Sequence, residues 1–320
     1  MDTLKGMLTP NDIEEWLPKL RRGIDVYGSA YKTAMERVNT QDKRKRELAM
    51  RIFAWIVHAK RQLHMEEIKH ALGTIVGKSH FDPDDVVPER IILSVCAGLV
   101  AYDNLTSIVR LVHYTTQEYL GKHWAERFQT ETMQITGICI TSLSFRDFQS
   151  GHCETEKEGS ERLQRFALLD YAANHWGDHA RHLEEMMPDT AAKIGGNVFP
   201  TQIAMSFLSN KRLVYNAIQV MASGKKTSIS NTSGLHLTTT FGLLGLSKLL
   251  LANNADVNAL GLFRNVARRH SEENVTPLYI ASYKSFDDIT LLLLDNGAEM
   301  LKADSVAMPF GPPARRTTRT

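Results

Sequence analysis

The chain has 320 residues, enough for two or three domains, and its 43% hydrophobic and 23% charged residues are typical of a globular protein. A formal net charge of +2 excludes a global field that would direct the molecule to nucleic acid or an anionic membrane. No apolar run reaches the roughly 18 residues of a membrane-spanning helix, and no secretory signal opens the chain. Together with three cysteines that lack C-x-x-C spacing, this predicts a cytoplasmic protein with reduced thiols.

The first part of the chain, residues 13–38, is predicted to be helical, with a break at Pro18 and Gly23. A basic cluster follows and precedes an amphipathic helix over residues 48–59. We interpret the cluster as the solvated start of that helix. The alternatives are a signal that directs the protein to the nucleus and a patch that contacts phosphates. The residues of the cluster are Lys43, Arg44, Lys45 and Arg46.

A second helix, residues 65–72, is expected to turn Met65, Ile68 and Leu72 toward a core. The glycine-rich stretch that follows, residues 73–79, is one residue short of a phosphate-binding loop between its glycines. Because it follows a helix where a phosphate loop must follow a strand, we interpret it as a solvent loop.

The segment over residues 91–119 reads as one supersecondary unit. An apolar helix ends at Gly98, strands are predicted over residues 99–102 and 108–112, and a new helix opens at Thr115. The turn is Asp103-Asn104, and Val109 and Leu111 lie on the opposite side of the second strand from Ile108 and Val112. Helices followed by a hairpin and a helix indicate a winged-helix domain.

The phrases SVCAGLV and IVRLVHYTTQEYL in this unit resemble a winged helix known from fungal NOD-like proteins, labelled the GPI inositol-deacylase winged helix. The resemblance covers most of residues 46–124. The phrase LPKLRRGIDVYGSAYKTAMERV is similar to the closing helices of the NACHT NTPase module that precedes it in those proteins. The resemblance therefore implies that the chain begins where a nucleotide-binding domain ends, and that the winged helix packs on such a module.

Two residues of this domain bear on the resemblance. The family commonly has Thr or Ser as the cap of the helix at residues 65–72, where this chain has His64. The predicted recognition helix, residues 89–99, offers only Arg90 for contacts with phosphates or bases, and the hairpin turn has no basic residue. Binding of nucleic acid is therefore not expected.

Helices are expected next over residues 129–143 and 162–183, with a polar loop at residues 149–159, and a helical pair over residues 201–221. The phrase DYAANHWGDHARH is similar to the helical linker of the same fungal proteins.

This linker helix places His175, His179 and His182 on one face, a spacing that could ligate zinc. We interpret them as ordinary packing and surface histidines, because Asp178 lies on another face and a glycine in mid-helix, Gly177, leaves the geometry of the three poorly defined.

Two segments near the C-terminus align at a constant offset of 43 residues, which is the distance from Ser233 to Thr276. They resemble the ankyrin repeat, whose period is about 33, and the excess falls in the finger loop between Asn258 and Thr276. Both repeats depart from the pattern: Gly234 replaces proline, Thr238 and Thr239 replace alanines, Tyr279 replaces histidine, and Lys284-Ser285 replaces the glycine of the helical hairpin.

Two such repeats cannot bury a stack alone, so the first is expected to pack on the helices of residues 201–221. The predicted surface for a protein partner is the concave face of the repeats together with the enlarged finger loop. Exposed phenylalanine with arginine in this loop is typical of interfaces, and the alternative is a loose insertion. The predicted contact residues are Leu262, Phe263, Arg264, Arg268 and Arg269.

The predicted fold is mainly α, with a winged helix, a helical linker and two ankyrin-type repeats. We expect the chain to be a fragment of a longer protein at both ends. The expected divisions are a helical tail at residues 1–42, the winged helix at 43–125, the linker domain at 126–226, the repeats at 227–302 and a disordered tail at 303–320.

No catalytic motif, cofactor loop or metal signature is found, and no G-x-S-x-G elbow supports the deacylase of the family label. We expect a non-enzymatic interaction or regulatory module, similar to the downstream part of a fungal NOD-like signalling receptor, whose repeats bind a protein. Two alternatives stay open: a transcription regulator that binds DNA through the winged helix, and an inositol-deacylase-like hydrolase.

Overall fold

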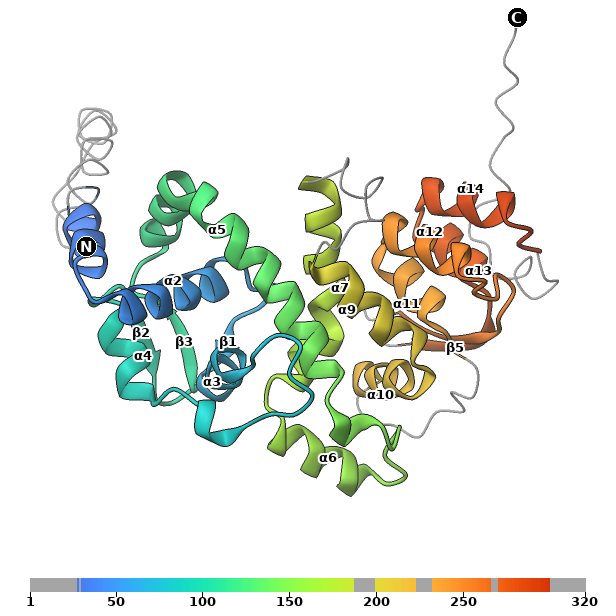
Figure 1. Ribbon diagram of the computed structural model, residues 1–320, viewed down its shortest axis with the longest axis horizontal. Helices are drawn as coiled ribbons and strands as arrows, with labels where there is room; N and C mark the ends of the chain where they lie inside the picture. Colours follow the sequence, from blue (N-terminus) through green and yellow to red (C-terminus); the bar gives the residue numbers. More distant parts are fainter. Residues whose placement is uncertain (1–27, 29, 187–198, 223–231, 266–269, 300–320) are drawn as a thin grey trace, which may run out of the picture. The chain divides into compact units, whose positions relative to one another are not determined.

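The computed structural model describes residue 28 and residues 30–186, 199–222, 232–265 and 270–299. These residues form two compact units, shown in Figure 1. The first unit contains the described residues up to 73 together with residues 84–132, and the second contains residues 74–83 together with the described residues from 133 onward. Within this described part of the chain, no helix is both long and apolar enough to span a bilayer.

The first unit is built on helix α2 (Lys43–His58), which packs against α3 (Met65–Gly73) and α4 (Glu89–Val95). The Asp42 carboxylate accepts a hydrogen bond from the Lys45 amide at 3.1 Å and so caps the start of α2. The apolar positions predicted for this helix and the next are buried as expected. They include Ile52, Phe53, Trp55, Met65, Ile68 and Leu72.

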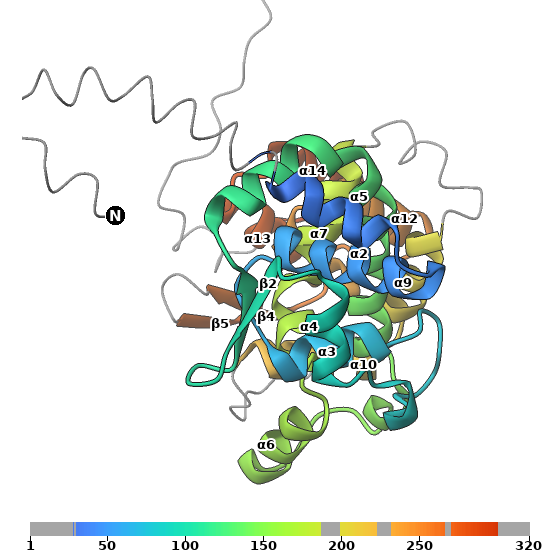
Figure 2. The same ribbon diagram turned by 90° about the vertical axis from the view of Figure 1, so that its left-hand side faces the viewer.

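A three-stranded antiparallel sheet completes this unit, in the order β1 (Leu63–His64), β3 (Ile108–Leu111), β2 (Val100–Asp103). The predicted hairpin is confirmed, with the first strand shifted by one residue. Val109 and Leu111 face the core, whereas Val112 is 50% exposed. Figure 2 shows this hairpin extending from the helices of its unit, which is the wing of a winged helix.

The start of α3 explains how the fold tolerates His64 in place of a capping Ser or Thr. The Glu67 carboxylate, 9% exposed, accepts the His64 amide at 2.8 Å and both terminal nitrogens of Arg61 at 2.9 and 2.7 Å. The carboxylate therefore takes over the capping of the entering backbone, and the arginine compensates its charge.

Helix α5 (Tyr114–Leu143) is longer than predicted and continuous. The sequence predicted one helix that opens at Thr115 and another over residues 129–143, and this separation into two helices is wrong. Nothing between them stops a helix: there is no proline, and Gly121 lies in open space within the helix. The two units therefore share this helix.

The single helix predicted over residues 162–183 is also wrong, because the chain forms α6 (Glu156–Arg165) and α7 (Leu169–Met186). Thr155 caps α6 by accepting the Glu158 amide at 3.2 Å, inside the stretch expected to be a polar loop. Phe166 ends α6 and packs on Phe148, with ring centroids 4.9 Å apart. Aromatic packing, invisible in the local pattern, separates the two helices.

Three helical pairs follow and stack on one another, as Figure 1 shows. The pairs are α9 (Phe199–Ser209) with α10 (Lys211–Met221), α11 (Gly234–Phe241) with α12 (Leu244–Ala252), and α13 (Pro277–Tyr283) with α14 (Asp287–Asp295). Helix α11 contacts both α9 and α13, and α12 contacts both α9 and α14. The predicted packing of the first repeat on the helices of residues 201–221 is confirmed.

The second and third pairs repeat the same backbone hydrogen bonds at the predicted offset. The Leu243 amide donates to Thr238 at 2.9 Å and the Phe286 amide donates to Ala281 at 3.0 Å, each closing the turn within a pair. After each pair, Ala255 donates to Leu250 and Ala298 to Leu293, both at 3.0 Å. The two segments are therefore structural repeats of one another.

The departures of the first repeat from the ankyrin pattern have local causes. A side chain at Gly234 would place its Cβ 2.4 Å from the Leu208 carbonyl oxygen, so the close approach of α9 requires glycine there. Thr238 and Thr239 are fully buried, and their hydroxyls donate to the Leu235 carbonyl at 3.1 and 2.9 Å. Their polar groups are thus satisfied within α11.

Candidate functional site

The finger loop forms a two-stranded antiparallel hairpin, β4 (Gly261–Asn265) with β5 (His270–Val275). Its base is fixed to the repeats, because the Leu262 amide donates to the Thr232 hydroxyl at 2.9 Å and the Leu262 side chain is only 5% exposed. Leu262 therefore belongs to the core and does not fit the predicted contact surface. A side chain at Gly261 would meet the His236 ring at 2.6 Å, which explains the glycine.

The other predicted contact residues lie farther along this hairpin. Phe263 pairs with Glu272 and Arg264 with Ser271 in the strand register, and their side chains lie outside the described residues. Arg268 and Arg269 lie outside the described residues altogether. The role of these four residues in partner binding stays a prediction.

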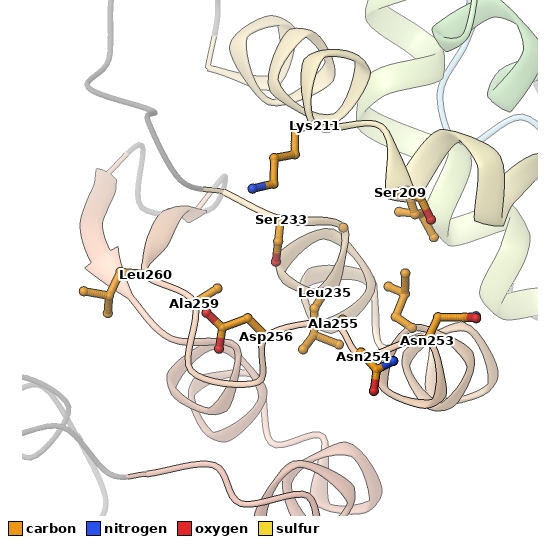
Figure 3. Close-up of a pocket in the computed structure, with 13 residues that line it drawn as sticks. Ser209, Lys211, Ser233, Leu235, Asn253, Asn254, Ala255, Asp256, Ala259 and Leu260 are labelled. Carbon is orange, nitrogen blue, oxygen red and sulfur yellow. The ribbon is translucent and has the colours of Figure 1, made fainter.

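A pocket of about 540 Å³ lies beside the base of the hairpin. Figure 3 shows Lys211, at the start of α10, on one side and Asp256 and Ala259, in the loop after α12, on another. The apolar surface of the pocket comes mainly from buried leucines, Leu208, Leu235 and Leu250. Its polar groups come mainly from Ser209, Asn253 and Asn254.

The pocket is bordered by two exposed side chains of opposite charge, Lys211 and Asp256. The Asp256 carboxylate accepts the Asn258 amide at 2.9 Å, which fixes the loop that carries it. Asn258 then bridges to the next repeat, because its side chain donates to the Gly297 carbonyl at 3.2 Å and accepts the Glu299 amide at 2.8 Å. The walls of the pocket are therefore held by the stacking of the repeats.

Ser233, at the edge of this pocket, makes a hydrogen bond that resembles a nucleophile–base pair. Its hydroxyl lies 2.9 Å from His236 Nδ1. His236 Nε2 lies 3.1 Å from the Val275 carbonyl, which can only accept, so Nε2 carries the proton. Burial lowers the pKa of His236 to about 4, so the imidazole is a poor base. The pair acts as a helix cap and as a bond between repeats.

The three histidines of α7 do not converge. His179 is buried and lies 2.8 Å from the Tyr171 hydroxyl, whereas His175 Nδ1 lies 3.2 Å from the Asp178 carboxylate. Among the described residues, no three His, Cys, Asp or Glu side chains form a group that could hold a metal ion. Gly177 lies within the continuous helix α7, and its missing side chain leaves room for the Phe241 ring.

The cysteines and the glycine-rich stretch have structural roles. All three cysteines are free and buried, and burial raises the pKa of the Cys96 and Cys139 thiols.

In the glycine-rich stretch, within residues 74–82, the Gly77 amide donates to the Thr141 hydroxyl at 3.1 Å, and Lys78 pairs with Asp82 at 3.2 Å. The amide and the lysine that a phosphate loop would direct at a ligand are thus used within the protein.

The exposed surface of the first unit is mixed. The basic cluster starts α2, where Lys45 pairs with Asp42 at 3.2 Å and Lys43 with Glu47 at 3.9 Å. Helix α4 exposes Arg90, Ile91 and Ser94, and the tip of the wing carries Leu105, 97% exposed. These positions are poor in the basic and amide side chains that read DNA.

The helices and the three-stranded sheet of the first unit agree with one comparison. Residues 35–131 match the family model of the GPI inositol-deacylase winged helix domain. The match covers the winged helix alone, which is less than half of the chain. No curated protein matches the chain, and no solved structure matches it.

The winged helix and its hairpin were visible in the sequence, but the pocket was not. Asp256 stands in the repeated loop motif, so the alignment of the two repeats could have pointed to it. Lys211 and Ser209 come from the preceding helical pair, and no local signal connects them to residues some forty positions later. Only the stacking of the pairs brings them to one pocket.

Proposed function

We propose that this chain is a non-enzymatic regulatory module that binds a protein partner through its stacked helical pairs, used as ankyrin-type repeats. The observation that carries the proposal is that the α11–α12 and α13–α14 pairs repeat the same capping bonds, the same turn within the pair and the same turn after it. Repeat stacks of this kind present extended surfaces whose loops recognise other proteins. The pocket with Lys211 and Asp256 lies on the loop side of the stack.

The chemistry of the pocket supports recognition of a polypeptide. An apolar floor with a few polar groups at its edge is the usual design of a binding site. A cation and an anion on opposite edges suit a partner segment that carries both charges, and exposed asparagines can bond to its backbone. The Ser233–His236 pair supports the non-enzymatic assignment, since the ring is buried and its pKa is too low for a general base at neutral pH.

The winged helix fits the same proposal. Its resemblance to the domain that follows the NTPase module of fungal NOD-like proteins suggests that it packs on such a module and relays its state to the repeats. Exposed apolar side chains on α4 and the wing, Ile91 and Leu105, suit a protein surface better than DNA. In this proposal the protein works in the cytoplasm without a cofactor of its own.

Site-specific photo-crosslinking tests the proposal. A photoreactive phenylalanine analogue would replace Lys211 or Asp256 in the full chain, inside cells. The matched control would place the same group at Lys157 on α6, which is also exposed and belongs to the same unit. We expect one defined protein adduct at the pocket positions, and none at Lys157.

The captured protein would then be purified and its binding to the chain measured directly. We expect Lys211→Glu to weaken binding about tenfold or more, because it reverses a charge at the pocket edge. Equal crosslinking at all three positions, or binding unchanged by Lys211→Glu, would contradict the proposal. Turnover of an ester substrate by the purified chain would favour the hydrolase alternative.

A further inference from the structure

The last described helix of the stack, α14, exposes large apolar side chains on its outward side. Leu291 is 60% exposed and Leu294 is 45% exposed, whereas Ile289 and Leu293 are almost fully buried. At about 100° per residue along a helix, Leu291 lies at the centre of the side opposite the buried residues. An isolated exposed leucine is ordinary, but two on one helix face form the start of an apolar strip.

Acidic side chains surround this strip. Asp287, Asp288 and Asp295 are exposed on the same side of α14, and Glu299 follows the helix. With Lys284 as the only cation, residues 284–299 have a formal charge of −3, although the whole chain carries +2. Asp287 and Asp288 suit the positive end of the helix dipole, but Asp295 lies in the last turn, where a negative charge destabilises the helix. The stability of α14 alone therefore does not explain why acidic side chains border the apolar strip.

A further stacked pair would not cover Leu291. The equivalent position of the preceding repeat is Lys248, which stays exposed although the α13–α14 pair stacks beside it. Leu291 therefore lies on the outer side of the stack, and its exposure does not result from the absence of a further pair. A second copy of this chain is also a poor occupant, because matching faces would oppose four carboxylates to four others.

We propose that the outward face of α14 binds a basic amphipathic helix of another protein. Leu291 and Leu294 would receive its apolar side chains, and Asp288 and Asp295 would pair with lysines or arginines on either side. This surface is separate from the pocket beside the hairpin, and it stands whether or not the pocket binds a partner.

Peptide binding to the full chain tests the proposal. The probes are a synthetic amphipathic helix of leucine and lysine and its counterpart of leucine and glutamate, followed by fluorescence anisotropy. We expect saturable binding of the Leu/Lys peptide only, and a loss of at least about tenfold in Leu291→Lys. The variant copies the residue that the preceding repeat has at this position, so the fold should be kept.

The matched control is Ile75→Lys, which makes the same change of charge at another exposed apolar residue of the same unit. We expect its affinity for the Leu/Lys peptide to equal that of the original chain. The double variant Asp288→Lys/Asp295→Lys should lose the Leu/Lys peptide and gain the Leu/Glu peptide.

Three results would overturn the proposal. One is equal weakening by Leu291→Lys and Ile75→Lys, which would mean that the peptide responds to total charge. Another is the absence of saturable binding. The third is a dimer in sedimentation that Leu291→Lys dissociates, which would assign the face to a second copy of the chain.

Discussion

At the scale of single residues, His236 is a buried group whose titration is coupled to folding. Its ring joins Ser233, at the start of α11, to the Val275 carbonyl, at the end of β5. Both bonds require the neutral imidazole in one tautomer. Protonation of His236 Nδ1 would leave a buried charge. It would also replace the hydrogen bond that Nδ1 accepts from Ser233 by a repulsive contact with the Ser233 amide, which lies 3.2 Å away.

Because both bonds need the neutral His236 ring, we expect the protein to lose stability in acid. The unfolded histidine takes a proton near its ordinary pKa of 6.5, and the folded one only near about 4, so its stabilisation is complete above pH 6.5 and is lost as the pH falls toward 4. The full effect is roughly 3 kcal/mol in the free energy of unfolding. The free energy of unfolding, measured with denaturant, should therefore fall less steeply with falling pH in His236→Asn than in the original protein. Parallel curves for the two proteins would contradict this role.

Gly177 shows why a helix-breaking residue stands in the middle of α7. A Cβ at this position would lie 2.0 Å from Phe241 Cγ, so glycine allows α7 and α11 to approach. Trp176 beside it packs edge to face on Phe241 at 5.4 Å and on Phe207 at 5.6 Å. The aromatic cluster explains a glycine that helix propensity alone disfavours.

Replacing this glycine should therefore destabilise the protein although alanine is the better helix former. We expect Gly177→Ala to lower the free energy of unfolding by about 1–3 kcal/mol through overpacking. The control is Gly159→Ala in α6, where nothing lies within 4 Å of the added Cβ, and we expect a gain of about 0.5–1 kcal/mol there. Thermal unfolding of both variants measures the difference. A stabilised Gly177→Ala protein would show that α7 and α11 leave room for a methyl group beside Phe241.

At the scale of elements, the two repeats use different residues for the same tight turn. Gly242 turns the chain between α11 and α12 with φ of 73°, and Ser285 does so between α13 and α14 with φ of 57°. A left-handed conformation is costly for a residue with a Cβ. The absence of glycine in the second repeat therefore changed the sequence pattern but not the turn.

The turn predicts a stabilising substitution. Ser285→Gly should raise the free energy of unfolding by about 1 kcal/mol, since it removes the left-handed strain at an exposed position. The denaturant midpoint measures this gain. At the equivalent position we expect Gly242→Ala to lower the midpoint, because φ is positive and the new Cβ would lie 2.8 Å from the Phe286 ring. An unchanged midpoint for Ser285→Gly would mean that the serine is not strained.

At the scale of the whole molecule, charge decides between a protein partner and DNA. The net charge is +2, and the basic cluster of α2 is partly compensated by Asp42 and Glu47. The described helix α4 and the wing expose two arginines, Arg90 and Arg110, beside apolar side chains. A surface of this kind releases few counterions on a phosphate backbone.

We therefore expect the full chain not to be retained on double-stranded DNA at about 50 mM salt. A column or gel-shift assay measures this, with a basic DNA-binding protein of similar size as the positive control. Retention that falls steeply with added salt would favour the transcription regulator, and the variant Lys43→Ala/Arg44→Ala would then show whether the basic cluster is responsible.

Much of the fold follows from local patterns in the sequence. The winged-helix hairpin was predictable because apolar residues alternate along β3 and an Asp-Asn pair marks the turn, where the Asp103 carboxylate accepts a hydrogen bond from the Leu105 amide. The two repeats were predictable because Ser233 and Thr276 both begin helices and the leucine-rich helices follow at the same spacing. Errors arose where packing overrides pattern, as at Phe166, or where nothing ends a helix, as in α5.

The sequence by itself determined the type of the elements and the repetition of 43 residues, because helix caps, turns and apolar spacing act within a few residues. Only the tertiary structure decided what covers and completes those elements. The start of α12 has no capping side chain of its own, and the Glu184 carboxylate of α7 accepts its Gly245 and Leu246 amides at 3.1 Å. In the same way, Lys211 reaches the pocket from another pair, and Leu262 is buried. Such partners lie far apart along the chain, and the physical reason that they meet is the burial of apolar surface when the pairs stack.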